Sequence, residues 1–201
     1  MFSYNTIIAP SKEVLHKERG SKFYGLAFPV KTNTEVKNAI KDLKNKHSSA
    51  GHFCYAYKYG IEKTYYRVSD DGEPNNSAGL PIYGQLEAYK LTNILIVIVR
   101  YFGGTKLGVG GLISAYKTTA KLTLGSSQIK TLDILVPCKL SFVYEDISKV
   151  MRVIKKHQII IKSQRLEMEC EVLVLAKKIN LDRLIITIEA FHQIKIEILN
   201  D

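Results

Sequence analysis

The order of apolar patterns in the C-terminal third constrains the fold more than any other feature of the sequence. Period-two alternation, typical of strands, and three- and four-residue spacing, typical of amphipathic helices, follow one another in six segments. The segments lie at 132–144, 147–157, 159–161, 166–174, 180–188 and 194–198. This βαββαβ order predicts a ferredoxin-like domain, with two helices on one face of a four-stranded antiparallel sheet.

The preceding part of the chain shows a less regular α+β pattern. Strands are predicted at 20–30, 52–59, 63–68 and 94–101, and helices at 36–43, 77–89 and 112–119. Four aromatic residues share one face of the strand at 52–59, and such a face more often packs in the core than binds a ligand. They are Phe53, Tyr55, Tyr57 and Tyr59. The segment 125–128 lacks a core pattern, which predicts two domains at 1–128 and 129–201.

Composition narrows the class of protein. Apolar residues make up 46% and charged residues 24% of the chain, the usage of a folded globular protein. The longest aliphatic run, 94–99, is far shorter than the ~20 residues of a membrane span, and no secretory signal pattern opens the chain. We therefore expect a cytoplasmic protein without membrane contact. Its three cysteines have neither disulfide-framework nor zinc-site spacing, so reduced packing residues are expected. They are Cys54, Cys138 and Cys170.

Positive charge is concentrated in the first part. The net charge is +10, and residues 1–130 contribute 18 basic and 9 acidic side chains, a net +9. Residues 131–201 contribute 11 basic and 10 acidic side chains, a net +1. A basic surface attracts phosphates, which indicates RNA or another polyanion as a partner of the first part. The alternative is a lysine-rich surface that only maintains solubility.

An acidic segment lies between a predicted strand and a predicted helix. Asp70, Asp71 and Glu73 fall within four residues, and burying three carboxylates together requires pairing, hydrogen bonding or a cation. The spacing does not match a calcium-binding loop. A turn with a helix N-cap is the favoured interpretation, and a cation-binding or catalytic loop is the alternative. We expect no bound metal and no cofactor.

A glycine-rich segment at 100–111 joins the most apolar strand to the last helix of the first part. Backbone N–H groups at a helix N-terminus favour anions, and Arg100 and Lys106 add positive charge. Neither the Walker pattern nor the dinucleotide-binding fingerprint is complete here. An anion site and a tight turn for close packing therefore remain equal alternatives.

These segments together resemble the YigZ/IMPACT family in its bacterial two-domain form. The resemblance rests on Gly20-Ser21-Lys22-Phe23, on His52 through Tyr57, on Arg67 through Pro81, and on Arg100 through Gly111 followed by Ala115-Tyr116. It implies a first domain like domain 2 of ribosomal protein S5 and a second like the C-terminal domain of elongation factor G. It also implies a link to the regulation of translation. The family's characteristic polar residues correspond to Lys22, His52, Arg67, Asp70, Asp71, Glu73, Arg100, Lys106 and Tyr116.

The leading functional hypothesis is a noncatalytic protein that binds RNA or the ribosome, with a translation-associated protein as a further partner. The residues expected to contact RNA phosphates or another anion are Lys22, His52, Arg67, Arg100, Gly103, Gly104, Lys106, Gly108, Gly110 and Gly111. One alternative is an enzyme for an anionic small molecule, with His52 as acid or base. Another is a protein-interaction adaptor. The sequence identifies no catalytic nucleophile.

Overall fold

The computed structural model describes residues 1–199 and divides into two compact units. The first unit is Tyr4–Leu132, and the second contains Met1–Ser3 and the chain from Asp133 onward. The α+β class expected from the sequence is confirmed. The division follows Leu132 rather than residue 128, because β7 (Ile129–Asp133) pairs with β1 (Ser3–Ile7) in a two-stranded sheet.

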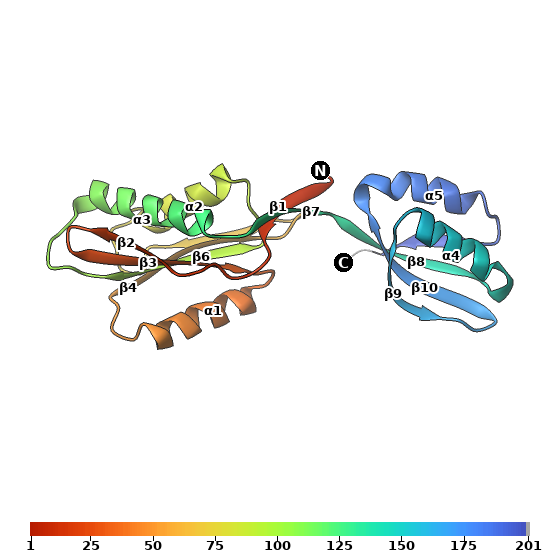
Figure 1. Ribbon diagram of the computed structural model, residues 1–201, viewed down its shortest axis with the longest axis horizontal. Coiled ribbons are helices and arrows are strands. Elements are labelled where there is room, and N and C mark those ends of the chain that lie inside the picture. The colour runs from red at the N-terminus through yellow and green to blue at the C-terminus, as the bar shows by residue number, and fades with distance from the viewer. Residues whose placement is uncertain (200–201) are drawn as a thin grey trace. The chain divides into compact units, whose positions relative to one another are not determined.

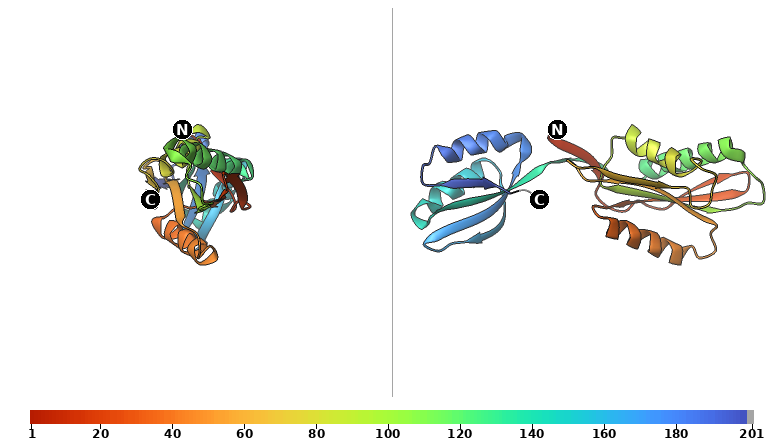
Figure 2. Two further views of the ribbon diagram at one scale, coloured as in Figure 1. Left: turned by 90° about the vertical axis from the view of Figure 1, so that its left-hand side faces the viewer. Right: turned by 180° about the vertical axis from the view of Figure 1, so that it is seen from behind.

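The first unit is built on a five-stranded antiparallel sheet. Its strand order is β2 (Val14–Glu18), β3 (Ser21–Pro29), β6 (Ile94–Tyr101), β4 (His52–Tyr59) and β5 (Tyr65–Ser69). Helices α2 (Gly79–Ala88) and α3 (Gly108–Gly125) cover one face, and α1 (Asn33–Lys46) lies alone on the other (Figure 1). The same three layers are visible from behind in the right-hand view of Figure 2.

The central strand β6 explains the most apolar run of the sequence. Its even-numbered residues from Ile94 to Ile98 belong to the core beneath α2 and α3, and its odd-numbered residues from Leu95 to Val99 to the core beneath α1. Helices cover both faces of this strand. Polar side chains at every second position would therefore be buried without hydrogen-bond partners, and this explains the continuous apolar run. Arg100, two residues after Ile98, therefore points towards α2 and α3.

The strands predicted at 52–59 and 63–68 pair as an antiparallel hairpin, β4 and β5. Cys54 and Ala56 pack towards α2 and α3, while the aromatic residues of β4 pack towards α1. Phe53 and Tyr57 are each 8% exposed, and Tyr55 and Tyr59 are half-buried. The interpretation of this face as core is therefore correct for two of its four aromatic residues and only partly so for the others.

Helix α1 separates apolar and basic residues as its spacing predicts. Its N-terminus is capped by the Thr32 side chain, which accepts a hydrogen bond from the Glu35 N–H at 3.2 Å. Val36 and Leu43 are buried against the sheet. Three exposed lysines, Lys37, Lys41 and Lys44, lie along one side of the helix, and we call them the lysine stripe.

The second unit has the predicted βαββαβ order. Its elements are β8 (Leu135–Val143), α4 (Ile147–Lys156), β9 (Ile160–Arg165), β10 (Glu169–Lys177), α5 (Leu181–Glu189) and β11 (Lys195–Ile198), with 3₁₀ turns at Tyr144–Asp146 and Lys178–Asn180. The antiparallel sheet has the order β11-β8-β10-β9, and both helices pack on one face (Figure 1). The segment expected as one strand at 132–144 forms β7 and β8, which belong to different sheets.

Candidate functional site

The acidic loop is held by hydrogen bonds to the main chain. The Asp70 Oδ1 atom accepts from the N–H groups of Ala78 and Gly79, both at 2.9 Å, at the start of α2. Its Oδ2 atom accepts from the Asn76 N–H at 2.9 Å. The Asp71 carboxylate accepts from the Phe53 N–H at 2.6 Å. Asp70 therefore binds the N–H groups at the start of α2 from eight and nine residues upstream, whereas Asp71 ties the loop to β4. The turn expected from the sequence is present, but the N-cap residue of α2, Ala78, makes no side-chain cap of its own.

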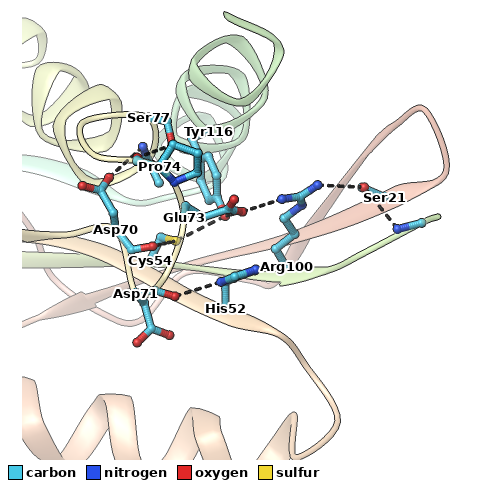
Figure 3. Close-up of polar contacts among 12 residues, drawn as sticks. Ser21, His52, Cys54, Asp70, Asp71, Glu73, Pro74, Ser77, Arg100 and Tyr116 are labelled. Atoms are coloured by element: carbon cyan, nitrogen blue, oxygen red, sulfur yellow. Dashed lines mark hydrogen bonds and ion pairs between the residues drawn. The ribbon is translucent and has the colours of Figure 1, made fainter. Parts of the chain in front are cut away.

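The third carboxylate is the centre of a buried polar network (Figure 3). Glu73 Oε1 lies 2.6 Å from Arg100 Nη1 and accepts a hydrogen bond from the Tyr116 hydroxyl at 2.7 Å. The Arg100 and Glu73 side chains are only 6% and 4% exposed. Cys54 Sγ lies 3.2 Å from the Tyr116 oxygen. The network thereby ties the acidic loop to β4, β6 and α3.

Arg100 was expected to contact phosphate at the surface, and the structure corrects this expectation. Its guanidinium packs between the rings of Phe23 and Phe102, at 5.4 and 5.6 Å from their centroids. Its Nη2 atom donates to Ser21 Oγ at 3.3 Å. Glu73 supplies the compensating charge that a buried guanidinium requires. Arg100 therefore neutralises an internal carboxylate and presents no free charge to a ligand.

Burial controls the protonation of the other network members. Desolvation raises the pKa of the Cys54 thiol well above its usual range, and the negative charge of Glu73 raises it further. Desolvation also raises the Tyr116 hydroxyl pKa, with Cys54 and then Glu73 as additional causes. Both groups stay protonated near neutral pH, so Cys54 lacks the thiolate that a nucleophile requires.

The glycine-rich loop combines a close backbone approach with an open surface. A Cβ atom on Gly103 would lie 1.9 Å from the Gly20 carbonyl carbon, so the two segments pack backbone against backbone. Gly104 and Gly108 have φ angles of +85° and +71°, which glycine adopts without strain. Gly110 and Gly111 lie in the first turn of α3 rather than in the loop. The tight turn predicted as one alternative is therefore present.

The remaining predicted residues are distributed over the unit. Lys22 lines a cavity of about 190 Å³ together with Gly20, Tyr24, Tyr101 and Phe102, next to the glycine-rich loop. Lys106 is exposed in that loop. His52 lies at the acidic loop, where its Nδ1 atom is 2.8 Å from the Asp71 carbonyl oxygen. Arg67 is exposed on β5, opposite Tyr57.

Sequence reasoning missed two members of the buried network. One is Ser21, whose Oγ atom accepts hydrogen bonds from Arg100 Nη2 and from the Gly103 N–H, both at 3.3 Å. Cys54 was expected only to pack. The strand alternation that places Cys54 towards α2 and α3 was available in the sequence, whereas the contact with Tyr116 links residues 62 positions apart.

Two kinds of feature are absent from the part of the chain that the structure describes. Within residues 1–199, no group of three or more histidine, cysteine, aspartate or glutamate side chains is placed to hold a metal ion. No helix in this part is both long and apolar enough to cross a bilayer.

The fold and the buried network define a two-unit α+β protein whose first unit carries a buried polar core. The family model of the Impact N-terminal domain matches residues 19–124, which include every member of that network. The chain belongs to the IMPACT family, as the sequence resemblance predicted.

Individual relatives agree with this assignment. The IMPACT family member YvyE of Bacillus subtilis is 37% identical over 116 residues, covering 58% of this chain and 53% of that protein. The IMPACT family member YigZ of Escherichia coli is 39% identical over 83 residues, covering 40% and 41% of the two chains. The chain thus spans about half the length of the curated relatives that it matches.

A solved structure supports the fold across both units. A crystal structure described as that of a hypothetical protein aligns with a TM-score of 0.75 and 22% identity. The alignment covers 100% of this chain and 99% of the other.

Proposed function

We propose that the protein binds RNA, free or within the ribosome, through its first unit, as a noncatalytic component of translational regulation in the cytoplasm. The observation that carries the proposal is the uneven charge. The first unit contains 18 basic and 9 acidic side chains, and the three carboxylates of the acidic loop are engaged by backbone N–H groups or by Arg100. Pairing Arg100 with Glu73 leaves the net charge of the first unit at +9, so this excess is carried by its other basic side chains.

The link to translation rests on the family. The resemblance to domain 2 of ribosomal protein S5 and to the C-terminal domain of elongation factor G suggests that both units are of types found on the ribosome. In this proposal, the first unit contacts RNA phosphates and the second unit orients it or contacts a translation-associated protein. Lys22 and Lys106 are exposed near one end of the first unit and are candidates for phosphate contacts.

The enzyme hypothesis receives less support from the geometry. Cys54 and Tyr116 are buried and protonated, and Arg100 is paired with Glu73. His52 faces the main chain of the acidic loop. Glu73 is hydrogen-bonded to both Arg100 and Tyr116, and Tyr116 to Cys54, which is typical of a structural network.

Binding of the full chain to RNA is expected to weaken steeply as salt rises. Each phosphate neutralised on single-stranded RNA contributes about −0.7 to the slope of log K against log salt, because condensed counterions are released. Fluorescence anisotropy with labelled oligouridylate across a potassium chloride series measures this slope. Absence of binding at low salt, or binding that salt does not affect, would contradict the proposal.

A further inference from the structure

A row of tyrosine rings crosses the β4–β5 hairpin on the face that α1 only partly covers. Tyr55, Tyr57 and Tyr59 follow one another along β4, with ring centroids 6.3 and 5.6 Å apart and planes within 16° of parallel. Tyr65 of β5 continues the row, 5.4 Å from Tyr59. We call these four residues the tyrosine row. Its outer end is accessible, since Tyr65 is 46% exposed.

The lysine stripe of α1 borders this row on one side. Lys44 Nζ lies 5.5 Å from the ring centroid of Phe53, at the start of β4. Lys37 and Lys41 lie on the same side of the helix because residues three and four positions apart are neighbours. A short connection at 47–51 reverses the chain between α1 and β4, so these lysines continue from Lys44 towards the Tyr59 end.

Cations of the hairpin border the other side. Arg67 lies directly opposite Tyr57 in the antiparallel pair, so both side chains are on the α1 face. Lys63 Nζ lies 5.4 Å from the Tyr65 ring centroid. The tyrosine row therefore lies between two sets of cations, with the lysine stripe on one side and Lys63 and Arg67 on the other. We call this surface, the tyrosine row together with the cations beside it, the strip.

Carboxylates are placed away from the middle of this strip. Glu35 and Asp42 lie on the opposite flank of α1, the flank whose Lys46 pairs with Glu13 at 2.6 Å. Glu62 lies in the turn of the hairpin, and Asp71 is hydrogen-bonded to the Phe53 N–H at the other end. The three lysines of the stripe make no ion pair within residues 1–199. Their charge is therefore available to an anionic ligand.

We infer that this strip is a binding site for single-stranded RNA, an inference that rests on the proposed function and deepens it. Phosphates would lie against the lysine stripe and Arg67, and an unpaired base would stack on the exposed ring of Tyr65 at the outer end of the tyrosine row. Aromatic rings between cations bind single strands because every base has a stackable face, whereas a duplex hides these faces. The site therefore distinguishes single-stranded from double-stranded RNA without reading sequence.

Two pairs of matched variants test the site in the full chain. The charge pair compares Lys37→Glu/Lys41→Glu with Lys117→Glu/Lys121→Glu. Both sets are exposed and four residues apart on a helix, but α1 and α3 lie on opposite faces of the sheet. The aromatic pair compares Tyr65→Ala with Tyr66→Ala. Tyr66 is 63% exposed and stacks on Tyr83, 4.9 Å away, on the other face of β5.

The strip variants are expected to weaken binding of oligouridylate in anisotropy titrations. Tyr65→Ala should lower affinity about 5-fold or more, because stacking contributes at least that much per base. Tyr65→Phe keeps the ring and should bind normally. Lys37→Glu/Lys41→Glu should also flatten the salt slope, by about 0.7 for each lost phosphate contact. The matched controls should change affinity much less, and an RNA duplex of equal length should bind more weakly than the single strand.

The outcomes separate the two proposals. Suppose that the wild-type protein binds RNA. The proposed site is then wrong if Lys37→Glu/Lys41→Glu and Lys117→Glu/Lys121→Glu lose the same affinity, or if Tyr65→Ala binds as well as the wild type. Either result would leave the proposed function standing. Absence of salt-sensitive binding by the wild-type protein would overturn both. Circular dichroism and thermal melting of each variant confirm that the fold is retained.

Discussion

Replacing Glu73 by alanine is expected to lower the free energy of unfolding by about 3–5 kcal/mol. The change leaves the Arg100 guanidinium buried without its counter-charge, and the Tyr116 hydroxyl loses its acceptor at 2.7 Å. An unpaired buried charge is far more costly than a missing surface ion pair. Urea unfolding followed by circular dichroism measures the loss of stability. An unchanged m-value would show that the variant and the wild-type protein expose the same surface on unfolding, so that their free energies can be compared.

A double variant provides the control for this prediction. Glu73→Leu with Arg100→Met removes both charges and keeps most of the side-chain volume, so it should recover much of the stability lost by Glu73→Ala. A loss below about 1 kcal/mol for Glu73→Ala would contradict the role of the pair, because that is the range of exposed ion pairs.

Gly103→Ala is the second change with a large expected effect. The added methyl group would lie 1.9 Å from the Gly20 carbonyl carbon and 2.2 Å from the Ser21 nitrogen. Main-chain atoms cannot rotate away as a side chain can, so the glycine-rich loop and the β2–β3 turn must separate. We expect a loss of about 2–3 kcal/mol in the free energy of unfolding.

Gly110→Ala is the matched control for Gly103→Ala. Gly110 lies in α3, and a Cβ atom there meets nothing within 4 Å. Alanine favours the helix over glycine, so this variant should be stabilised by about 0.5–1 kcal/mol. Equal stabilities of the two variants in urea unfolding would contradict the close backbone approach.

Strand and helix patterns predicted the second unit well because β8, β10, α4 and α5 each have one buried and one exposed face. Cys170, Val172 and Val174 alternate on the buried face of β10, and Leu184 and Ile188 are one helical turn apart on α5. The boundary was harder to place. β7 and β1 show little alternation, and they form a sheet only by pairing segments from opposite ends of the first unit.

Arg100 shows where prediction of the site failed. Its place in β6, two residues after Ile98, already directed the side chain towards α2 and α3. What the sequence did not show was a partner, because Glu73 reaches it from a loop 27 residues away. Without that pairing, a basic residue next to glycines was interpreted as a surface phosphate ligand.

The tyrosine row was predicted only in part. Alternation placed Tyr55, Tyr57 and Tyr59 on one face, and this is correct. Tyr65 joins them through the register of the hairpin, in which it lies opposite Tyr59. A turn of several residues does not fix that register from sequence. The position of the lysine stripe beside β4 likewise depends on tertiary packing of α1.

Crosslinking tests the central claim, that single-stranded RNA binds along the tyrosine row, most directly. The full chain is irradiated with bound oligouridylate at low salt, and the modified peptides are identified by mass spectrometry. We predict crosslinks to Tyr65 and to half-buried Tyr55 and Tyr59 that disappear in Lys37→Glu/Lys41→Glu. Crosslinks confined to the second unit, or to α3, would contradict the account.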